Sequence, residues 1–220
     1  MGLLGVLLPP SCAGCGRYGE PICADCRSCL RPLSNGSDQF LAPDPGIVVG
    51  EALLLAAAAF AHRDEAQRIL RRLKYGGGRR LAAPLAHEAW PAFRRLLAIT
   101  GPVPLVPVPL HRSRQRDRGY NQAELIAREL GRRARAPVWP AICRQRRTER
   151  QHGLDRATRM RNLRDAMAFE PPPSSGARPP TTVILVDDIL TTGATFEACA
   201  VILREAGVAE VYGFAIAREV

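Results

Sequence analysis

The stretch Thr182–Thr195, TVILVDDILTTGAT, decides how the rest of the chain is interpreted. It opens with a mostly β-branched apolar run at 183–186, which has the length and composition of a buried strand. Asp187 and Asp188 follow directly, and a loop of small residues comes next at 191–195. A helical pattern then completes the unit. The order predicts a strand, an acidic tip, a loop and a helix start, as in α/β proteins.

The helical pattern covers 196–206 and stops at Gly207, which is a common helix terminator. The first backbone N–H groups of a helix have no partner within it, and the helix dipole favours an anion there. Carboxylates such as Asp187 and Asp188 accept hydrogen bonds from vicinal hydroxyls. The unit therefore predicts a site for ribose 5-phosphate, although the same residues could form an ordinary strand end with capped turns. The phosphate would contact Thr191, Thr192, Gly193, Ala194 and Thr195.

The charge of the chain is concentrated in one segment. The formal net charge of the 220 residues is +10, and residues 111–164 contain 16 Arg against 5 Asp or Glu, an excess of +11. The remainder therefore sums to −1, so an anionic partner is expected at that segment. No apolar run reaches the ~18 residues of a membrane span. We expect no integral membrane segment and a cytoplasmic location.

Five of the seven cysteines lie near the beginning of the chain, between Cys12 and Cys29. Two C-x2-C pairs this close can place four thiolates around one tetrahedral Zn²⁺ at ~2.3 Å. Four cysteine ligands would fill the coordination shell of the metal and leave no open position for catalysis, which indicates a structural metal. Disulfides, or reduced thiols without metal, are the alternatives, and Cys29 could replace one ligand. The predicted ligands are Cys12, Cys15, Cys23 and Cys26.

The remaining chain alternates strand-like and helix-like patterns, which predicts an α/β fold. Residues 34–46 are rich in Ser, Asn, Gly, Asp and Pro and indicate a linker. Strands are expected within 47–60 and at 103–108, 138–143 and 210–217, and helices at 64–73, 81–97 and 121–130. The second helix should be interrupted near Pro84 and Pro91, and 109–118 should be a basic loop.

The stretch at 182–195 resembles the motif with which type I phosphoribosyltransferases bind 5-phosphoribosyl 1-pyrophosphate (PRPP). The resemblance implies a parallel sheet flanked by helices, with Mg²⁺ bound together with PRPP. It also implies that Asp187 and Asp188 hold the ribose hydroxyls and that residues 191–195 hold the 5-phosphate. Thr191 stands where 6-oxopurine transferases carry an Asp, which argues against purine salvage.

Two basic segments acquire roles through the same resemblance. The loop after the first core strand should hold the pyrophosphate, and the long polar segment at 144–154 should be the catalytic hood that closes over PRPP. Arg suits pyrophosphate because its planar fork donates two hydrogen bonds and stays charged. The implied pyrophosphate ligands are His111, Arg112 and Arg118, with Arg114 beside them; the implied hood residues are Arg144, Arg146, Thr148 and Gln151.

The combination of a four-Cys front and this core resembles the ComF family over nearly the whole chain. The motifs that carry the resemblance are LKYG at 73–76, PVPLH at 107–111, RGYNQA at 118–123, R-x-R-x-T-x-x-Q at 144–151 and VDDILTTGAT at 186–195. It implies a zinc-ribbon-like module at 1–33, a linker at 34–46 and a phosphoribosyltransferase-like domain at 47–220. It also implies a link to DNA uptake.

Two classes of function follow from these expectations. The first is an enzyme that binds PRPP with Mg²⁺ and transfers its phosphoribosyl group to an unidentified acceptor. The second is a non-catalytic, single-stranded DNA-binding accessory of a competence helicase or translocase. Rings are scarce in the basic segment, where Tyr120 and Trp139 are the candidates for stacking on bases.

Overall fold

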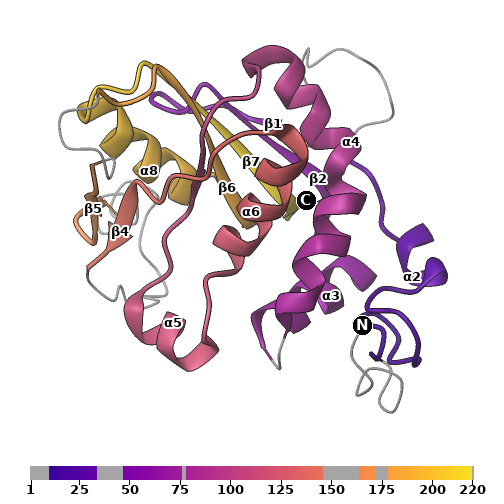
Figure 1. The fold of residues 1–220 in the computed structure, drawn as a ribbon. Coiled ribbons are helices and arrows are strands. Elements are labelled where there is room, and N and C mark those ends of the chain that lie inside the picture. Colours follow the sequence, from indigo (N-terminus) through magenta and orange to yellow (C-terminus); the bar gives the residue numbers. More distant parts are fainter. Residues whose placement is uncertain (1–9, 34–46, 76–77, 146–163, 172–177, 220) are drawn as a thin grey trace.

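The computed structural model describes residues 10–33, 47–75, 78–145, 164–171 and 178–219 (Figure 1). Its centre is a five-stranded sheet in the order β1-β2-β7-β6-β3. The strands β2, β7, β6 and β3 are parallel to one another, and β1 is antiparallel to β2. Their bounds are Ile47–Val48 for β1, Leu55–Ala61 for β2, Leu105–Pro107 for β3, Thr182–Leu190 for β6 and Glu210–Arg218 for β7.

Helices cover both faces of this sheet, so its central strands are apolar on both sides. One face packs against α3, α4 and α6, and its core includes Ile69, Phe93 and Ile126. The other face packs against α8 and a small antiparallel pair, β4 and β5, with Phe196 and Leu203 in its core. The bounds are Asp64–Lys74 (α3), Ala82–Thr100 (α4), Gln122–Ala134 (α6), Ala194–Glu205 (α8), Ile142–Arg144 (β4) and Met167–Phe169 (β5). The predicted α/β class with a parallel sheet is confirmed.

The cysteine-rich front of the chain, with helix α2 (Ala24–Ser28), packs directly on the larger unit. Cys12, Ile22 and Leu30 are buried in the same core as α3 and α4. Its last residues continue along β2: the N–H of Leu33 donates to the carbonyl of Ala59, and the N–H of Ala61 donates to that of Arg31, both at 3.0 Å. The predicted linker at 34–46 lies outside the described residues.

Three local expectations were wrong. Strand β6 does not end before the acidic pair but continues to Leu190, because its pairing with β7 runs from Thr182 to the end of the strand. Helix α4 is continuous through Pro91. Pro84 is tolerated because the first N–H groups of a helix need no partner, and buried packing holds the helix together around Pro91.

The third concerns the basic segment after β3, which is not a loop over its whole length. Residues Arg112–Arg118 form a short helix, α5, because the Nδ1 atom of His111 accepts the N–H of Ser113 at 3.1 Å and caps it. Helix α5 ends at Gly119, whose φ of 80° suits glycine. Among the described helices, none is long and apolar enough to cross a membrane.

Candidate functional site

The connections of strands β3 and β6 create a crevice at their carboxyl ends. The two strands are parallel neighbours, but α6, which follows β3, packs on one face of the sheet, whereas α8, which follows β6, packs on the other. In open α/β sheets ligands bind at such a reversal, because the two chains separate there. The acidic pair and the Thr/Gly loop thus lie at the carboxyl end of β6, and α5 follows the carboxyl end of the neighbouring strand β3.

The Thr/Gly loop leads into the N-terminus of α8 as the sequence predicted. Gly193 is the N-cap with φ 80°, and α8 begins at Ala194. Thr191 and Thr192 are exposed, and the Oγ1 atom of Thr192 accepts the N–H of Ala194 at 3.4 Å. A Cβ atom on Gly193 would lie 2.7 Å from the Cγ1 atom of Val48. The loop therefore has hydroxyls and a helix start available, and β1 packs closely against its glycine.

A buried carboxylate in the first turn of α8 holds the β1–β2 connection in place. The Glu197 side chain accepts the backbone N–H groups of Glu51 at 3.1 Å, Ala52 at 2.7 Å and Leu53 at 3.1 Å. A Cβ atom on Gly50 would lie 1.9 Å from its Oε2 atom, so any other residue there would displace the carboxylate. Sequence reasoning missed this residue, although a single Glu in an otherwise apolar helical turn was a signal.

Asp188 lies beneath the crevice in a chain of polar contacts. It is 3% exposed; its Oδ2 atom is 2.7 Å from the Nζ atom of Lys74, and its Oδ1 atom accepts the Nε2–H of Gln122 at 3.3 Å. Arg118 donates to the Oε1 atom of Gln122, and its guanidinium lies 5.5 Å from the ring centre of Tyr75. The carboxylate of Asp188 is therefore paired with Lys74, which was not among the site residues predicted from the sequence.

Asp187 lies towards the α8 side of β6, as the alternation of side chains along a strand predicts, but its carboxyl group is still close enough to that of Asp188 to interact with it. It lies near Arg144 of β4 and Cys199 of α8, and its Oδ1 atom accepts the N–H of Asp188 at 2.7 Å. Its side chain is partly exposed, yet the packing around it is dense, so desolvation and then the charge of Asp188 raise its pKa well above the ordinary value. Joint binding of adjacent hydroxyls by the two carboxylates stays a prediction.

Helix α5 and the end of α3 form a pocket of about 580 Å³ above Asp188. Its charged lining comes from Lys74, Arg114, Asp117 and Arg118, and Tyr75, Leu110 and Gln122 complete it. Of the predicted pyrophosphate ligands, the structure places Arg118 in this pocket. His111 instead caps α5, and Arg112 lies exposed at the first position of that helix, near Cys143.

Two contacts fix the end of α3 beside α5. The hydroxyl of Tyr120 donates to the carbonyl of Leu73 at 2.5 Å, and Arg79 donates to the carbonyl of Gly119 at 2.5 Å. Arg79 also lies 5.3 Å from the ring centre of Tyr120. Tyr120 is buried, so the ring predicted as a stacking candidate instead joins α3 to the turn that follows α5.

The predicted hood falls almost wholly outside the described residues. Arg144 is the last residue of β4 and is largely buried, which lowers the pKa of its guanidinium; nearby Arg114 lowers it further. Its proximity to Asp187 and Arg114 places it at the crevice. Arg146, Thr148 and Gln151 lie outside the described residues, and their roles stay predictions.

The carboxylate of Asp188 is already occupied by protein groups, which bears on the Mg²⁺ expected together with PRPP. Mg²⁺ takes oxygen ligands, and in proteins it is commonly held by one or two carboxylates together with water and substrate phosphates. The Oδ2 atom of Asp188 is already 2.7 Å from a cationic ammonium, and its Oδ1 atom accepts a hydrogen bond from Gln122. A protein-bound Mg²⁺ at Asp188 would have to displace Lys74.

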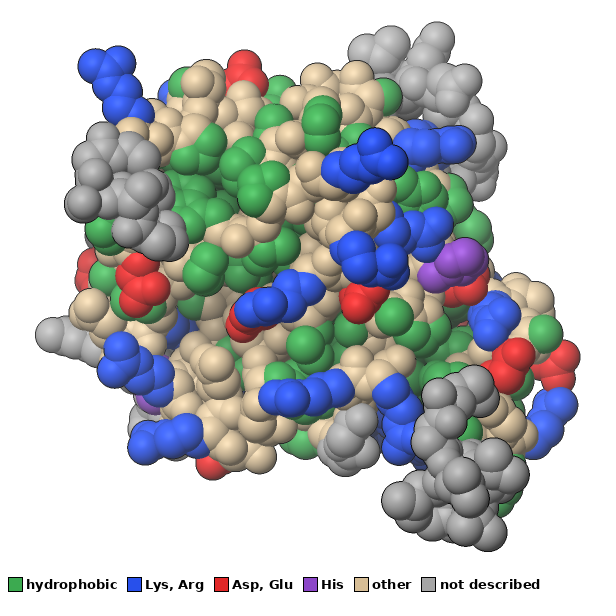
Figure 2. Space-filling view, in the orientation of Figure 1, with side chains coloured by type: hydrophobic (Ala, Val, Ile, Leu, Met, Phe, Trp, Pro, Cys, Tyr) green, Lys and Arg blue, Asp and Glu red, His purple; other side chains and the backbone are tan. Residues whose placement is uncertain are grey.

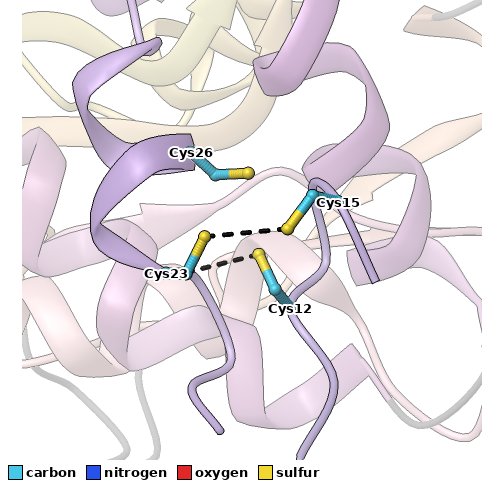
Figure 3. A group of neighbouring side chains, drawn as sticks. All are labelled: Cys12, Cys15, Cys23 and Cys26. Carbon is cyan, nitrogen blue, oxygen red and sulfur yellow. Dashed lines mark hydrogen bonds between the residues drawn. The ribbon is translucent and has the colours of Figure 1, made fainter. Parts of the chain in front are cut away.

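The four cysteines predicted as metal ligands come together at the front of the chain. Cys12 and Cys15 lie on a loop, Cys23 caps α2 and Cys26 lies within it, and Figure 3 shows the sulfurs converging. All four Sγ atoms lie within 4.8 Å of one another, and those of Cys15 and Cys23 are 3.7 Å apart. Sulfurs ~2.3 Å from a tetrahedral Zn²⁺ are spaced by about 3.8 Å, so the cluster could hold this metal.

The surroundings of the cluster favour a thiolate at Cys12. Burial acts to raise the pKa of this thiol, but backbone N–H groups of Cys15, Cys23 and Gly14 outweigh burial and lower the pKa to about 6. A Cβ atom on Gly14 would lie 2.5 Å from the Sγ atom of Cys26, which explains a glycine at this position. Cys29 is exposed and lies outside the cluster.

The sequence is related to known proteins over most of its length. It is 31% identical over 219 residues to Competence protein F of Haemophilus influenzae, a match that covers 94% of this chain and 90% of that protein. The chain belongs to the ComF family.

Other relatives of this ComF-family chain match over shorter stretches and carry another name. It is 31% identical over 169 residues to DNA utilization protein YhgH of Escherichia coli O157:H7, covering 76% of this chain and 66% of that protein. With the protein of the same name from strain K12 it shares 34% identity over 127 residues, which is 57% of this chain and 53% of that protein. No protein-family model matches the chain.

Proposed function

We propose that this ComF-family chain binds PRPP, or another phosphorylated ribose, in the crevice between β3 and β6 and transfers its phosphoribosyl group to an acceptor. The proposal rests above all on the pocket where Lys74, Arg114 and Arg118 gather over Asp188. A diphosphate needs clustered cations, and a 5-phosphate needs donors such as those at the start of α8. Both kinds of group lie at the carboxyl end of β6.

In this reaction the acceptor attacks the anomeric carbon of the ribose. The bond from that carbon to the diphosphate oxygen breaks, and the diphosphate leaves with the electron pair. Arg114 and Arg118 would stabilise the charge that develops on the leaving group, which is where fixed cations in a partly desolvated pocket act most strongly. The loop at 191–195 would hold the 5-phosphate throughout, so that the ribose stays in place while the bond to the diphosphate breaks and the bond to the acceptor forms.

Calorimetric titration with PRPP, ribose 5-phosphate and pyrophosphate tests the proposal. Thr192→Val removes a hydroxyl from the phosphate loop, and we expect it to weaken ribose 5-phosphate binding by about 3- to 10-fold, since a hydrogen bond contributes about 0.5–1.5 kcal/mol. Thr182→Val is the matched control, because this residue lies at the opposite end of β6. A wild-type protein that binds none of the three ligands at millimolar concentration would refute the proposal.

The names of the relatives supply the biological setting that we propose. Competence protein F and the DNA utilization proteins are named for the uptake and use of DNA. We place this chain in the same process, in the cytoplasm, where imported strands are handled and nucleotides are recovered. A PRPP-dependent step would connect incoming DNA with nucleotide metabolism.

A second candidate function is binding of single-stranded DNA beside a competence helicase or translocase. A groove of about 770 Å³ between the cysteine loop and α3 supports it, because Arg68, Arg71, Arg72 and Tyr75 line it along one helical face. Basic side chains also outnumber acidic ones on the face drawn in Figure 2. Affinity for an oligothymidylate should fall steeply with salt, and Arg71→Gln/Arg72→Gln should weaken it without affecting PRPP. Equal oligonucleotide affinity of this variant and the wild type would exclude the groove.

A further inference from the structure

We infer that Lys74 bridges the carboxylate of Asp188 and the diphosphate of the ligand, so that diphosphate binding does not require Mg²⁺. The inference rests on the proposed function and specifies how its ligand is held. It starts from the ammonium of Lys74, which is in contact with Asp188 and also lines the pocket.

Lys74 is exceptional in this sequence. The chain has 31 basic residues, and 30 of them are Arg. An ammonium is a compact point charge with three donors, whereas a guanidinium is a larger planar fork. The single lysine occurs where the partner is a buried carboxylate atom at 2.7 Å and where space is shared with two arginines. An ammonium suits this position because it is smaller than a guanidinium and fits between the carboxylate and the two arginines.

The Lys74 ammonium lies between the Asp188 carboxylate and the pocket. One side contacts Asp188, whose side chain is almost completely buried, and the other borders the pocket that Arg114 and Arg118 also line. The Lys74 side chain is 25% exposed, so its remaining donors can reach a ligand in the pocket. A carboxylate without Lys74 would repel a diphosphate, and the ammonium removes that repulsion while adding donors of its own.

The charge balance of the pocket depends on this residue. Lys74, Arg114 and Arg118 carry three positive charges, against the two negative charges of Asp117 and the underlying Asp188. Without Lys74 the charges would be equal in number, and the pocket would lose its preference for an anion. The chain Arg118–Gln122–Asp188 keeps the carboxylate oriented, so that Lys74 is held at a defined position before a ligand arrives.

Pyrophosphate and PRPP titrations in EDTA, and again with Mg²⁺, test the inference. We expect the wild type to bind pyrophosphate in EDTA, Lys74→Gln to bind it about 10- to 100-fold more weakly, and Lys74→Arg to fall between them. Arg132→Gln removes one exposed positive charge from α6 and should change the affinity by less than about 2-fold. Lys74→Gln leaves the buried charge of Asp188 unpaired, which could itself disturb the pocket. The double variant Lys74→Gln/Asp188→Asn removes both charges and is compared with Asp188→Asn alone. We expect the double variant to bind pyrophosphate more weakly than Asp188→Asn.

A direct readout uses the fact that the chain has one lysine. Incorporation of ¹³C-labelled lysine labels Lys74 alone without changing its donors, and its ε-carbon resonance should shift in EDTA as pyrophosphate saturates the site. An unshifted resonance, equal affinity of Lys74→Gln and wild type, or wild-type binding only with Mg²⁺ would overturn the inference and leave the proposed function standing. Failure of the wild type to bind either ligand under any condition would overturn both.

Discussion

Loss of the Glu197 carboxylate should loosen the β1–β2 connection and with it the phosphate loop. Three backbone N–H groups point at this side chain, and an ionised carboxylate suits them because it has acceptor sites only. The same connection follows Val48, which packs against Gly193. Glu197 thus acts on the ligand site through β1, as a positioning residue.

The size of the effect follows from the burial of the three donors. Glu51 is exposed and Ala52 half-buried, so water can replace the carboxylate at their N–H groups, whereas Leu53 is fully buried. A charge-assisted hydrogen bond contributes about 1.5–3 kcal/mol, and an unpaired buried donor costs about 1–3 kcal/mol. We expect Glu197→Ala to lower the free energy of unfolding by about 3–5 kcal/mol and Glu197→Gln by about 1–2 kcal/mol.

Urea denaturation followed by circular dichroism measures these changes. Glu205→Gln on the same helix is the control, because Glu205 forms an exposed pair with Arg164 and its loss should cost at most about 1 kcal/mol. Ribose 5-phosphate affinity should fall for Glu197→Ala at temperatures where the variant is still folded. A loss below about 1 kcal/mol for Glu197→Ala would refute the reasoning.

The remaining predictions concern the same elements and the metal cluster. Gly50→Ala should destabilise the fold by about 2–4 kcal/mol, since its Cβ atom would overlap the Glu197 carboxylate, and this loss should not add to that of Glu197→Ala in denaturation experiments. Cys26→Ser should reduce bound zinc, measured by mass spectrometry on the native protein, from about one ion per chain to a small fraction, whereas Cys29→Ser should leave it unchanged. Asp187→Asn should raise the melting temperature at neutral pH but not well below the ordinary carboxyl pKa of about 4. The raised pKa makes the folded state bind this proton more tightly, so wild-type stability falls as pH rises through the window above the ordinary value. A melting temperature of Asp187→Asn that follows the wild type at every pH would contradict that prediction.

The sequence predicted those features whose cause is local. The apolar run of β6, the glycine at the start of α8 and the spacing of the four cysteines each carry their own physical reason, and the structure has all three. The residue at which β6 ends could not be predicted from the local sequence, because it depends on pairing with another strand. Pairing with β7 extends the strand through Asp187 and Asp188 as far as Leu190.

The missed site residues come from elements far away in sequence. Lys74 reaches Asp188 from the end of α3, and Gln122 reaches it from the start of α6, so that their roles depend on how the helices pack. The cap that turns the basic segment into helix α5 is a histidine, which is not among the usual N-cap residues. Propensity and periodicity could not have found these contacts, although the solitary lysine was visible from composition.

The attachment of residues 31–33 to β2 has a consequence for any shortened form of the protein. Strand β1 pairs with β2 at Ala56 and Ala57, and the front of the chain pairs with it further along, at Ala59 and Ala61. Removal of the cysteine-rich front would leave the second half of an apolar strand with open N–H and carbonyl groups. Such an open strand recruits other chains and aggregates. We therefore expect the front of the molecule to protect this strand from pairing with other chains, independently of any metal that the four cysteines could hold.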